Sequence, residues 1–246
     1  MKIEEIPSKI NSKDMPLPKL ICDKDLCGIP EPLAGSDGVH FCLIISGKPA
    51  SGKSSLAISL LTAKKEKRVY RGRFDHIITF VPTHSLKSLK KNPFEDLDEK
   101  KQNSELTLEN LEDAYDLIKM HSNNGESTLL YLDDMASDLK QNVKVEELFN
   151  RIVLNRRHLL CSIIFLVQYW KSIPINVRKN SSHIILYKTL NKLENSAVFD
   201  EVLNLHRDDI DKIFKYVVDK RFNFLMIDIN RGRFYKNFNL LKIREG

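Results

Sequence analysis

Short apolar runs alternate with longer amphipathic stretches along most of the chain. Five runs are apolar almost throughout, as in strands that are buried on both faces of a sheet. They cover residues 40–46, 76–81, 127–132, 161–167 and 182–187. Apolar positions at helical spacing fill the intervals, at about 54–61, 105–121, 144–158 and 194–217. Buried strands alternating with helices predict an α/β fold, with a mainly parallel central sheet and helices on both faces.

Both ends of the chain depart from this pattern. Residues 1–38 hold five prolines, and we interpret them as an extended N-terminal arm rather than a domain. Residues 222–236 contain two strand-like segments around a turn, which predicts a C-terminal β-hairpin. Residues 83–104 are polar and charged, as in a surface excursion. The sequence thus predicts one domain over residues 39–246, which ends in a helical and hairpin extension.

A glycine-rich segment joins the first apolar run to the first helix. It fits the pattern G-x-x-x-x-G-K-[ST], a strand–loop–helix motif that binds nucleoside triphosphates, and we expect ATP. Gly47 and Gly52 let the backbone turn and approach the phosphates, and amides of the loop and of the helix N-terminus face the anion. Lys53 is expected to contact the β- and γ-phosphates, and the Ser54 hydroxyl to bind Mg²⁺. The predicted nucleotide-binding residues are Gly47, Lys48, Pro49, Ala50, Ser51, Gly52, Lys53, Ser54 and Ser55.

Polar side chains follow the third and fourth apolar runs. Asp133 and Asp134 end the third run, where a P-loop protein carries its second acidic group. We expect Asp133 to hold Mg²⁺, directly or through water, and Asp134 to orient and help deprotonate the attacking water. The structural alternative is an Asp pair that caps the next helix. Gln168 ends the fourth run, where a polar side chain can contact the γ-phosphate or simply face solvent.

Arg156 and Arg157 precede the fourth run. Two arginines beside a nucleotide site could stabilise transition-state charge, in their own subunit or across a subunit boundary. The alternative, for one of the two, is a helix C-terminus whose dipole is complemented by a cation.

The net charge of +6 is unevenly placed. Residues 1–170 carry 24 basic and 24 acidic side chains, whereas residues 171–246 carry 15 basic and 9 acidic ones. A charge run by itself is most often a solvated face. A basic C-terminal third beside a nucleotide site nevertheless favours a polyanionic partner such as DNA. No apolar run reaches the ~18 residues that a membrane span requires, so we expect none.

In combination, these motifs resemble the viral genome-packaging ATPases of the FtsK–HerA superfamily, of the type found in poxviruses, giant viruses and virophages. The similarity spans about residues 41–205, and it depends on segments 47–55, 129–134, 155–158 and 175–180 together with Gln168. Two departures stand out. Asp134 occupies a position where many members of the superfamily carry Glu, and the sequence shows no nuclease-like domain.

The resemblance implies an ATP-driven motor that moves double-stranded DNA into a preformed viral capsid. It implies hydrolysis of ATP with Mg²⁺ at the subunit interfaces of a homo-oligomeric ring, a pentamer or a hexamer, with Arg157 or Arg156 acting on the neighbouring subunit. It further implies a capsid or portal-vertex protein as partner, and action in the host cytoplasm or virus factory, or on the virion. For such a P-loop ATPase, the five apolar runs are expected in the strand order 5-1-4-3-2.

Two other functions fit the phosphate loop. A P-loop nucleotide or small-molecule kinase is the main alternative, but residues 83–104 contain no arginine, unlike the arginine-rich lid usual in such kinases. A regulatory GTPase would carry the base-reading motif N-K-x-D. Residues 191–194 read N-K-L-E, with Glu in place of Asp, and we interpret them as a coincidental near match.

Overall fold

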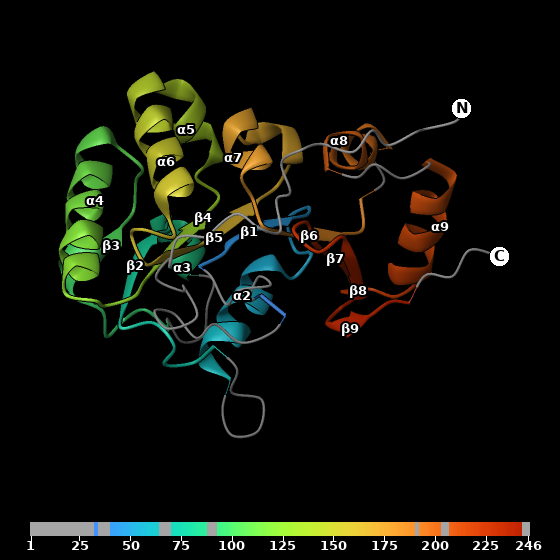
Figure 1. The fold of residues 1–246 in the computed structure, drawn as a ribbon, viewed down its shortest axis with the longest axis horizontal. Coiled ribbons are helices and arrows are strands. Elements are labelled where there is room, and N and C mark those ends of the chain that lie inside the picture. Colours follow the sequence, from blue (N-terminus) through green and yellow to red (C-terminus); the bar gives the residue numbers. More distant parts are fainter. Residues whose placement is uncertain are drawn as a thin grey trace, which may run out of the picture.

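The computed structural model describes residues 32–33, 40–63, 70–87, 93–189, 192–202 and 207–242. Within these ranges, nine strands form one sheet in the order β3-β2-β4-β5-β1-β6-β7-β8-β9 (Figure 1). They are β1 (Cys42–Ser46), β2 (His76–Phe80), β3 (Gln102–Asn103), β4 (Thr128–Asp133), β5 (Cys161–Val167), β6 (His183–Tyr187), β7 (Phe224–Asp228), β8 (Arg233–Lys236) and β9 (Asn239–Leu240). Strands β2, β4, β5, β1 and β6 are parallel. They are the five apolar runs, and their order confirms the predicted 5-1-4-3-2.

Helices cover both faces of this sheet (Figure 1). They are α2 (Lys53–Thr62), α3 (Thr83–Lys87), α4 (Leu108–Asn123), α5 (Ala136–Gln141), α6 (Val143–Asn155), α7 (Ile175–Lys179), α8 (Lys192–Val202) and α9 (Arg207–Val217), with 3-10 turns η3 (Glu99–Lys101) and η4 (Trp170–Ser172). In Figure 1, α4 to α7 lie above the sheet and α2 lies below it. The sheet therefore holds the carboxyl end of β1 between two packed layers.

Alternate residues of the central strands enter two separate cores, one on each face of the sheet. In β4, Leu130 and Leu132 pack with residues of α4 and α6, whereas Leu129 and Tyr131 pack with residues of α2. This two-sided burial explains why the strands are apolar throughout rather than alternating. Each fully buried side chain of this size stabilises the fold by about 1.5–3 kcal/mol. Both cores therefore fix the strand ends that carry the site.

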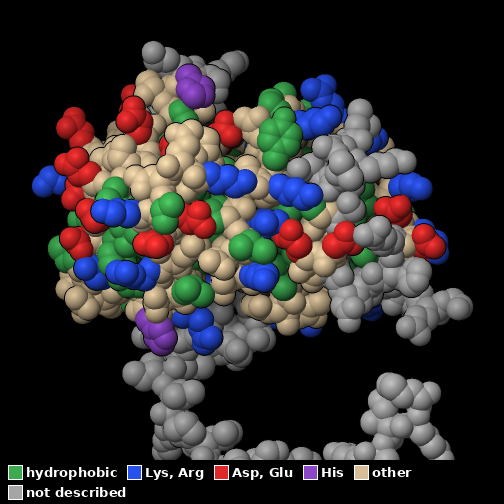
Figure 2. All heavy atoms as spheres, turned by 90° about the horizontal axis from the view of Figure 1, so that it is seen from above, with side chains coloured by type: hydrophobic (Ala, Val, Ile, Leu, Met, Phe, Trp, Pro, Cys, Tyr) green, Lys and Arg blue, Asp and Glu red, His purple; other side chains and the backbone are tan. Residues whose placement is uncertain are grey.

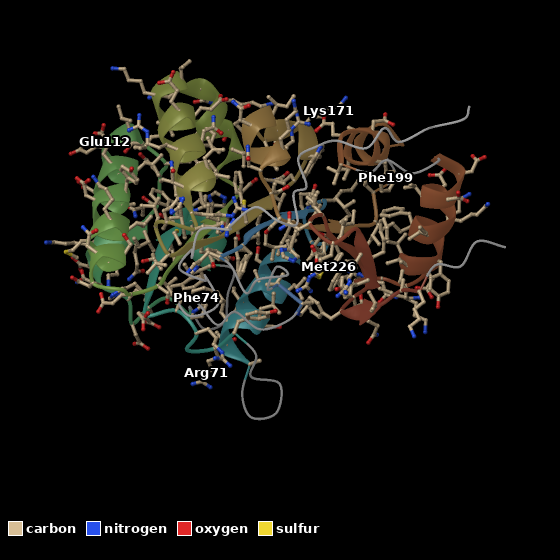
Figure 3. The ribbon with its side chains drawn as sticks, in the orientation of Figure 1. Arg71, Phe74, Glu112, Lys171, Phe199 and Met226 are labelled. Atoms are coloured by element: carbon tan, nitrogen blue, oxygen red, sulfur yellow. The ribbon has the colours of Figure 1, made fainter. Side chains whose placement is uncertain are left out.

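The surface of the molecule is mixed in charge. Phe74 and Met226 lie within the cores, whereas Glu112 and Lys171 lie on the outside (Figure 3). On the helical face, acidic side chains are most numerous at the end formed by α4, and Lys and Arg are scattered across the middle (Figure 2). In the part of the chain that is described, no helix is both long and apolar enough to cross a membrane.

The polar excursion at residues 83–104 is more ordered than its pattern indicates. It contains α3, η3 and the two-residue strand β3, which pairs in parallel with β2 through Thr79 and Gln102. The segment 194–217 is likewise two helices, α8 and α9. A two-residue strand has no periodicity of its own, so only its neighbour in the sheet specifies it.

The predicted C-terminal hairpin is present as β7 and β8. It continues the main sheet, because β7 pairs antiparallel with β6, with Ile227 opposite Ile184. All five residues of β7 are buried. The turn that leads into β7, at residues 219–223, is thereby placed beside the end of β6 and the glycine-rich loop.

The N-terminal arm lies outside the described residues except for Pro32 and Leu33. Leu33 is 1% exposed in the core on the α2 face, and its backbone N–H donates to the Tyr70 hydroxyl at 3.1 Å. This part of the arm therefore packs against the domain. The basic residues Lys64, Lys65, Lys67 and Arg68 also lie outside the described residues, as does Asn191 of the N-K-L-E segment.

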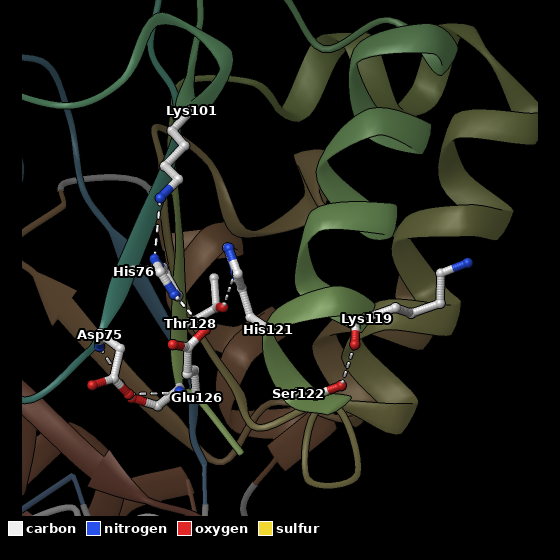
Figure 4. A network of polar contacts seen from close by, with 9 residues as sticks. Asp75, His76, Lys101, Lys119, His121, Ser122, Glu126 and Thr128 are labelled. Atoms are coloured by element: carbon white, nitrogen blue, oxygen red, sulfur yellow. Dashed lines mark hydrogen bonds and ion pairs between the residues drawn. The ribbon is translucent and has the colours of Figure 1, made fainter. Parts of the chain in front are cut away.

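Two histidines stack at the amino end of β2 (Figure 4). The rings of His76 and His121 have centroids 3.5 Å apart. His76 Nε2 lies 2.9 Å from a Glu126 oxygen, and His121 Nδ1 lies 3.0 Å from the Thr128 hydroxyl. Burial lowers the pKa of His121, and the nearby His76 and Lys101 lower that pKa further. The folded protein therefore favours the neutral His121 ring.

This burial predicts that the protein loses stability in mild acid. An unfolded chain protonates His121 below its ordinary pKa of 6.5, whereas the folded chain resists protonation. The stabilising contribution is thus present above pH 6.5 and is lost as the pH falls toward the lower folded pKa. Urea unfolding between pH 7.5 and 5.5 should show a smaller pH dependence for His121→Gln than for wild type. The exposed His158→Gln is the control, and an unchanged dependence in His121→Gln would contradict the prediction.

Candidate nucleotide site

The glycine-rich loop runs from the end of β1 to the start of α2. A Cβ on Gly47 would stand 2.7 Å from the Ser51 hydroxyl and 2.8 Å from Tyr187 Cβ, so no larger residue fits. Gly52 has φ +100°, and Ala50 has φ +60°. Gly52 precedes α2 without a side-chain cap, so the first amides of the helix are left to bind an anion.

Lys53 lies inside the loop that precedes it. Its ammonium group donates to the carbonyl of Gly47 at 2.6 Å and to that of Lys48 at 3.1 Å. The side chain is buried, which lowers the pKa of Lys53, while Asp133 and Asp134 oppose that shift. The loop thus holds a cation at its centre, where the motif predicts contact with the β- and γ-phosphates.

Ser54 and Asp133 meet across the gap between α2 and β4. The Ser54 hydroxyl donates to Asp133 Oδ2 at 2.8 Å. Burial raises the pKa of Asp133, against the Ser54 hydrogen bond and the charge of Lys53. A hydroxyl and a carboxylate at this separation are oxygen donors of the kind that Mg²⁺ takes, so the pair fits a shared divalent cation.

Asp134 and Gln168 form a second pair, at the ends of β4 and β5. Gln168 Nε2 donates to Asp134 Oδ2 at 2.7 Å. Asp134 has φ +59°, and its backbone N–H donates to the Leu166 carbonyl at 3.1 Å. A left-handed residue at a strand end is common at functional sites, because the surrounding structure must hold it there. The turn directs the Asp134 side chain toward β5 and away from the buried Asp133.

One cavity of about 170 Å³ contains these groups. Lys53, Ser54, Asp133, Asp134 and Gln168 all line it. The structure therefore brings together residues that the sequence separates by more than 100 positions. The cavity is also lined by residues that were not predicted for the site, namely Val81, Ser85, Phe94 and Tyr131.

Arg156 and Arg157 precede β5, so they lie at the amino ends of the parallel strands. Arg156 is half-buried, and it donates to the carbonyls of His40 and Val153 at 3.2 and 2.9 Å. Arg157 is exposed. Because β1 and β5 are parallel, the glycine-rich loop lies at the carboxyl ends of these strands and the two arginines lie at the amino ends. Neither arginine reaches the cavity of its own subunit. This position is incompatible with action of either arginine on the cavity of its own subunit. It leaves the other two alternatives, action on a neighbouring subunit and a cation at the end of a helix.

Tyr187, at the end of β6, was not among the predicted site residues. Its side chain packs so closely on Gly47 that a Cβ added there would lie 2.8 Å from Tyr187 Cβ. Its hydroxyl donates to the Gly52 carbonyl at 3.4 Å. Burial raises its pKa to about 12, so the hydroxyl stays protonated as a donor. The predicted strand order placed the fifth run beside the loop strand, and this signal could have identified the residue.

Comparison with known proteins places this fold. The chain matches the family model described as Poxvirus A32 protein over residues 37–229, and no curated protein sequence matches it. B204, the DNA-packaging ATPase from Sulfolobus Turreted Icosahedral Virus, is 18% identical, with 82% of this chain and 98% of that chain covered and a TM-score of 0.61. The genome packaging NTPase B204 from Sulfolobus turreted icosahedral virus 2, in complex with ATP-γS, is 17% identical over 82% and 98% of the two chains, with a TM-score of 0.57. EssC (ATPases 2 and 3) from Geobacillus thermodenitrificans is 12% identical over 84% and 40%, with a TM-score of 0.54.

At these identities the solved structures show only a common fold, and the assignment of the chain to a family depends on the family model. It covers most of the chain, including the glycine-rich loop, the acidic pair and Gln168. The chain therefore belongs to the Poxvirus A32 protein family, and it is a nucleotide-binding ATPase of the viral genome-packaging type within the FtsK–HerA superfamily.

Proposed function

We propose that this protein is a motor that uses ATP hydrolysis to move double-stranded DNA into a viral capsid. The observation that carries the proposal is the single cavity in which Lys53, Ser54, Asp133, Asp134 and Gln168 converge, in a chain of this family. The B204 structures, described as a DNA-packaging ATPase and as a genome packaging NTPase, support it through the common fold. The host cytoplasm or virus factory, or the virion, is the proposed place of action.

The residues of the cavity divide the work of phosphate binding. Amides of the loop and of the start of α2 bind the phosphate oxygens, and Lys53 exchanges its carbonyl partners for the β- and γ-phosphates. Ser54 and Asp133 would hold Mg²⁺, which neutralises charge on the β- and γ-oxygens when bound. Such a cation would lower the pKa of Asp133, which burial raises, because opposite charge favours the carboxylate.

Asp134 and Gln168 act on the water that attacks the γ-phosphate. Asp134 Oδ2 accepts from Gln168 Nε2, and this bond aims the carboxylate. The carboxylate accepts a hydrogen bond from the water and takes its proton as the water oxygen bonds to the γ-phosphorus, while the bond from that phosphorus to the bridging oxygen breaks and ADP leaves. Gln168 follows β5 directly, so a change in its hydrogen bonding after γ-phosphate loss is passed to that strand.

A ring explains how Arg157 takes part. Within its own subunit, Arg157 is exposed at the amino ends of the parallel strands, and the cavity lies at their carboxyl ends. In a closed ring of identical subunits, a head-to-tail contact brings one edge of a subunit against a different edge of the next. We propose that Arg157 enters the neighbouring subunit's cavity and stabilises charge on the transferring phosphoryl group. Arg156 is half-buried, whereas Arg157 is exposed, so the role is assigned to Arg157.

Lysines and arginines in the ring channel would contact DNA phosphates without reading bases. The helical face in Figure 2 is mixed in sign and offers no continuous basic track. The excess of basic over acidic residues lies in residues 171–246. We therefore assign the DNA-facing surface to the C-terminal third. A capsid or portal-vertex protein completes the proposed set of partners.

Duplex DNA is expected to raise the rate of ATP hydrolysis by the assembled protein. The stimulation should fall as salt rises from about 50 to 200 mM, because phosphate contacts release counterions. Steady-state phosphate release, measured with and without a long duplex, tests this. Lys53→Ala gives the background rate, and heparin controls for any polyanion. If a ring-forming preparation hydrolyses ATP at one rate with and without duplex DNA, the motor proposal fails.

A further inference from the structure

The hydrolysis cavity accounts for only one end of a nucleoside triphosphate. Asp133 ends β4, Asp134 follows it, and Gln168 follows β5, so the γ-phosphate end points toward these strands. β1 lies between β5 and β6 in the sheet. The ribose and base are therefore expected to leave the loop on the side away from Asp134, and a larger hollow adjoins the loop there, toward β6.

This second cavity, of about 400 Å³, adjoins the other side of the loop. Ala50 lines both cavities, so they meet at the loop itself. The walls come from three places: the loop, the end of β6 at Tyr187 and Lys188, and the turn at residues 219–223. A volume of this size accommodates a base and its ribose. The hydrolysis mechanism uses none of the residues of the turn.

Phe222 presents an aromatic ring in this cavity. It is 54% exposed, although large aromatic side chains are ordinarily buried. Its φ of +68° is in the left-handed region, a rare conformation for a bulky residue and one that persists where the surrounding structure imposes it. Its ring lies 3.3 Å from the position of a Cβ on Gly52, in contact distance of the loop just before α2.

A network of side chains holds the turn in this conformation. Asp219 accepts from Asn223 Nδ2 at 2.8 Å and lies 2.8 Å from Lys236 Nζ, and these contacts lower its pKa to about 2. Asn237 Nδ2 donates to Asn223 Oδ1 at 3.2 Å. The guanidinium group of Arg221 lies 4.7 Å from the centre of the Phe222 ring. The ring is therefore presented by a fixed turn, which reduces the entropy lost when a ligand stacks on it.

We propose that Phe222 is the platform on which the base of the bound nucleotide stacks. The inference rests on the nucleotide site of the proposed function and adds the base subsite to it. An aromatic base offers a flat π-face to the ring, and Arg221 places a cation beside the same stack. Stacking of this kind does not by itself select one base, so the predicted ligand class is an aromatic nucleobase on a triphosphate.

Two ligands separate the base from the phosphates. ATPγS carries both, whereas inorganic tripolyphosphate carries only the phosphate chain. Phe222→Ala is expected to weaken ATPγS binding by about 5- to 10-fold, the lower range for loss of one base–aromatic stack. Its affinity for tripolyphosphate should stay within about twofold of wild type, because the loop is untouched. Competition binding with Mg²⁺, on the full-length protein, gives both dissociation constants.

Three further variants interpret that result. Phe222→Gly removes the ring and relieves the left-handed strain, so it should match Phe222→Ala if stacking is the cause. Phe222→Trp should bind ATPγS at least as well as wild type does. Leu154→Ala replaces another exposed apolar side chain, on α6, and should change neither constant.

The outcomes distinguish this inference from the function on which it rests. Unchanged ATPγS affinity in both Phe222→Ala and Phe222→Gly overturns the platform, as does an equal loss for ATPγS and tripolyphosphate. Reduced stimulation by duplex DNA with normal ATPγS affinity also overturns it and places Phe222 on the DNA surface. Lys53→Ala should weaken both ligands, and if it weakens neither, the proposed nucleotide site itself is wrong.

Discussion

Asp134→Asn is expected to bind ATP and retain it without hydrolysis. Asn has the shape of Asp and can still accept from Gln168 Nε2, but it cannot take the proton of the attacking water. Loss of a general base typically slows a reaction by about 10²–10⁴-fold. Single-turnover hydrolysis of radiolabelled ATP, with bound nucleotide recovered on filters, should show full binding and at least about a hundredfold slower conversion.

The matched control for this variant is Asp116→Asn, an isosteric change on the surface of α4. It should leave both binding and turnover at the wild-type level. Gln168→Leu removes the donor that aims the carboxylate while leaving the carboxylate in place, so a smaller loss of rate is expected there. Turnover by Asp134→Asn within a few fold of wild type would remove Asp134 from catalysis.

Arg157→Ala is expected to abolish turnover in the assembled protein and to regain it when mixed with Lys53→Ala. Lys53→Ala subunits lack the phosphate contact but keep Arg157, whereas Arg157→Ala subunits keep an intact loop. At a mixed boundary, Arg157 of one subunit meets the intact loop of the other, and that site is complete. Loss of an arginine finger typically costs about 10³–10⁵-fold in rate, so activity in the mixture would stand clearly above either parent.

Arg151→Ala is the control for the mixing experiment, because Arg151 is an exposed arginine on α6, the helix that ends just before Arg156 and Arg157. It should leave the rate unchanged. Arg156→Ala should instead lower the stability of the fold, since Arg156 caps the carbonyls of His40 and Val153 within its own subunit. A mixture no more active than its parents, under conditions where subunits exchange, would argue against a shared site.

The central sheet could be predicted because its information is local. Each of β1, β2, β4, β5 and β6 is an apolar run long enough to stand out, and the glycine-rich loop identifies the strand that precedes it. The strands β3 and β9 were missed, since two residues carry no period and only the partner strand specifies them. The hairpin was predicted, but its union with β6 depends on antiparallel pairing between residues about 40 positions apart.

The residues of the site also divide into those that local sequence predicts and those that only tertiary contact identifies. Lys53 and Ser54 belong to a contiguous motif, and Asp133 follows a strand whose place relative to the loop is fixed by the fold. Asp134 and Gln168 were predicted separately, and their pairing depends on the adjacent parallel strands β4 and β5, after which they lie. Phe222 could not be found, because its meaning depends on an exposed position beside a loop 170 residues earlier. Tertiary contact alone distinguishes it from any other aromatic residue.

The two outermost strands of the sheet in the described structure, β3 and β9, contain two residues each. Backbone groups that remain open at a sheet margin are ready-made templates for adding a strand from another chain. Edge strands of two residues offer a neighbouring copy very few backbone groups with which to pair a strand of its own. We therefore expect subunits to associate through side-chain surfaces instead of a shared sheet. Such joints can tilt and re-form during each cycle without breaking a ladder of main-chain bonds.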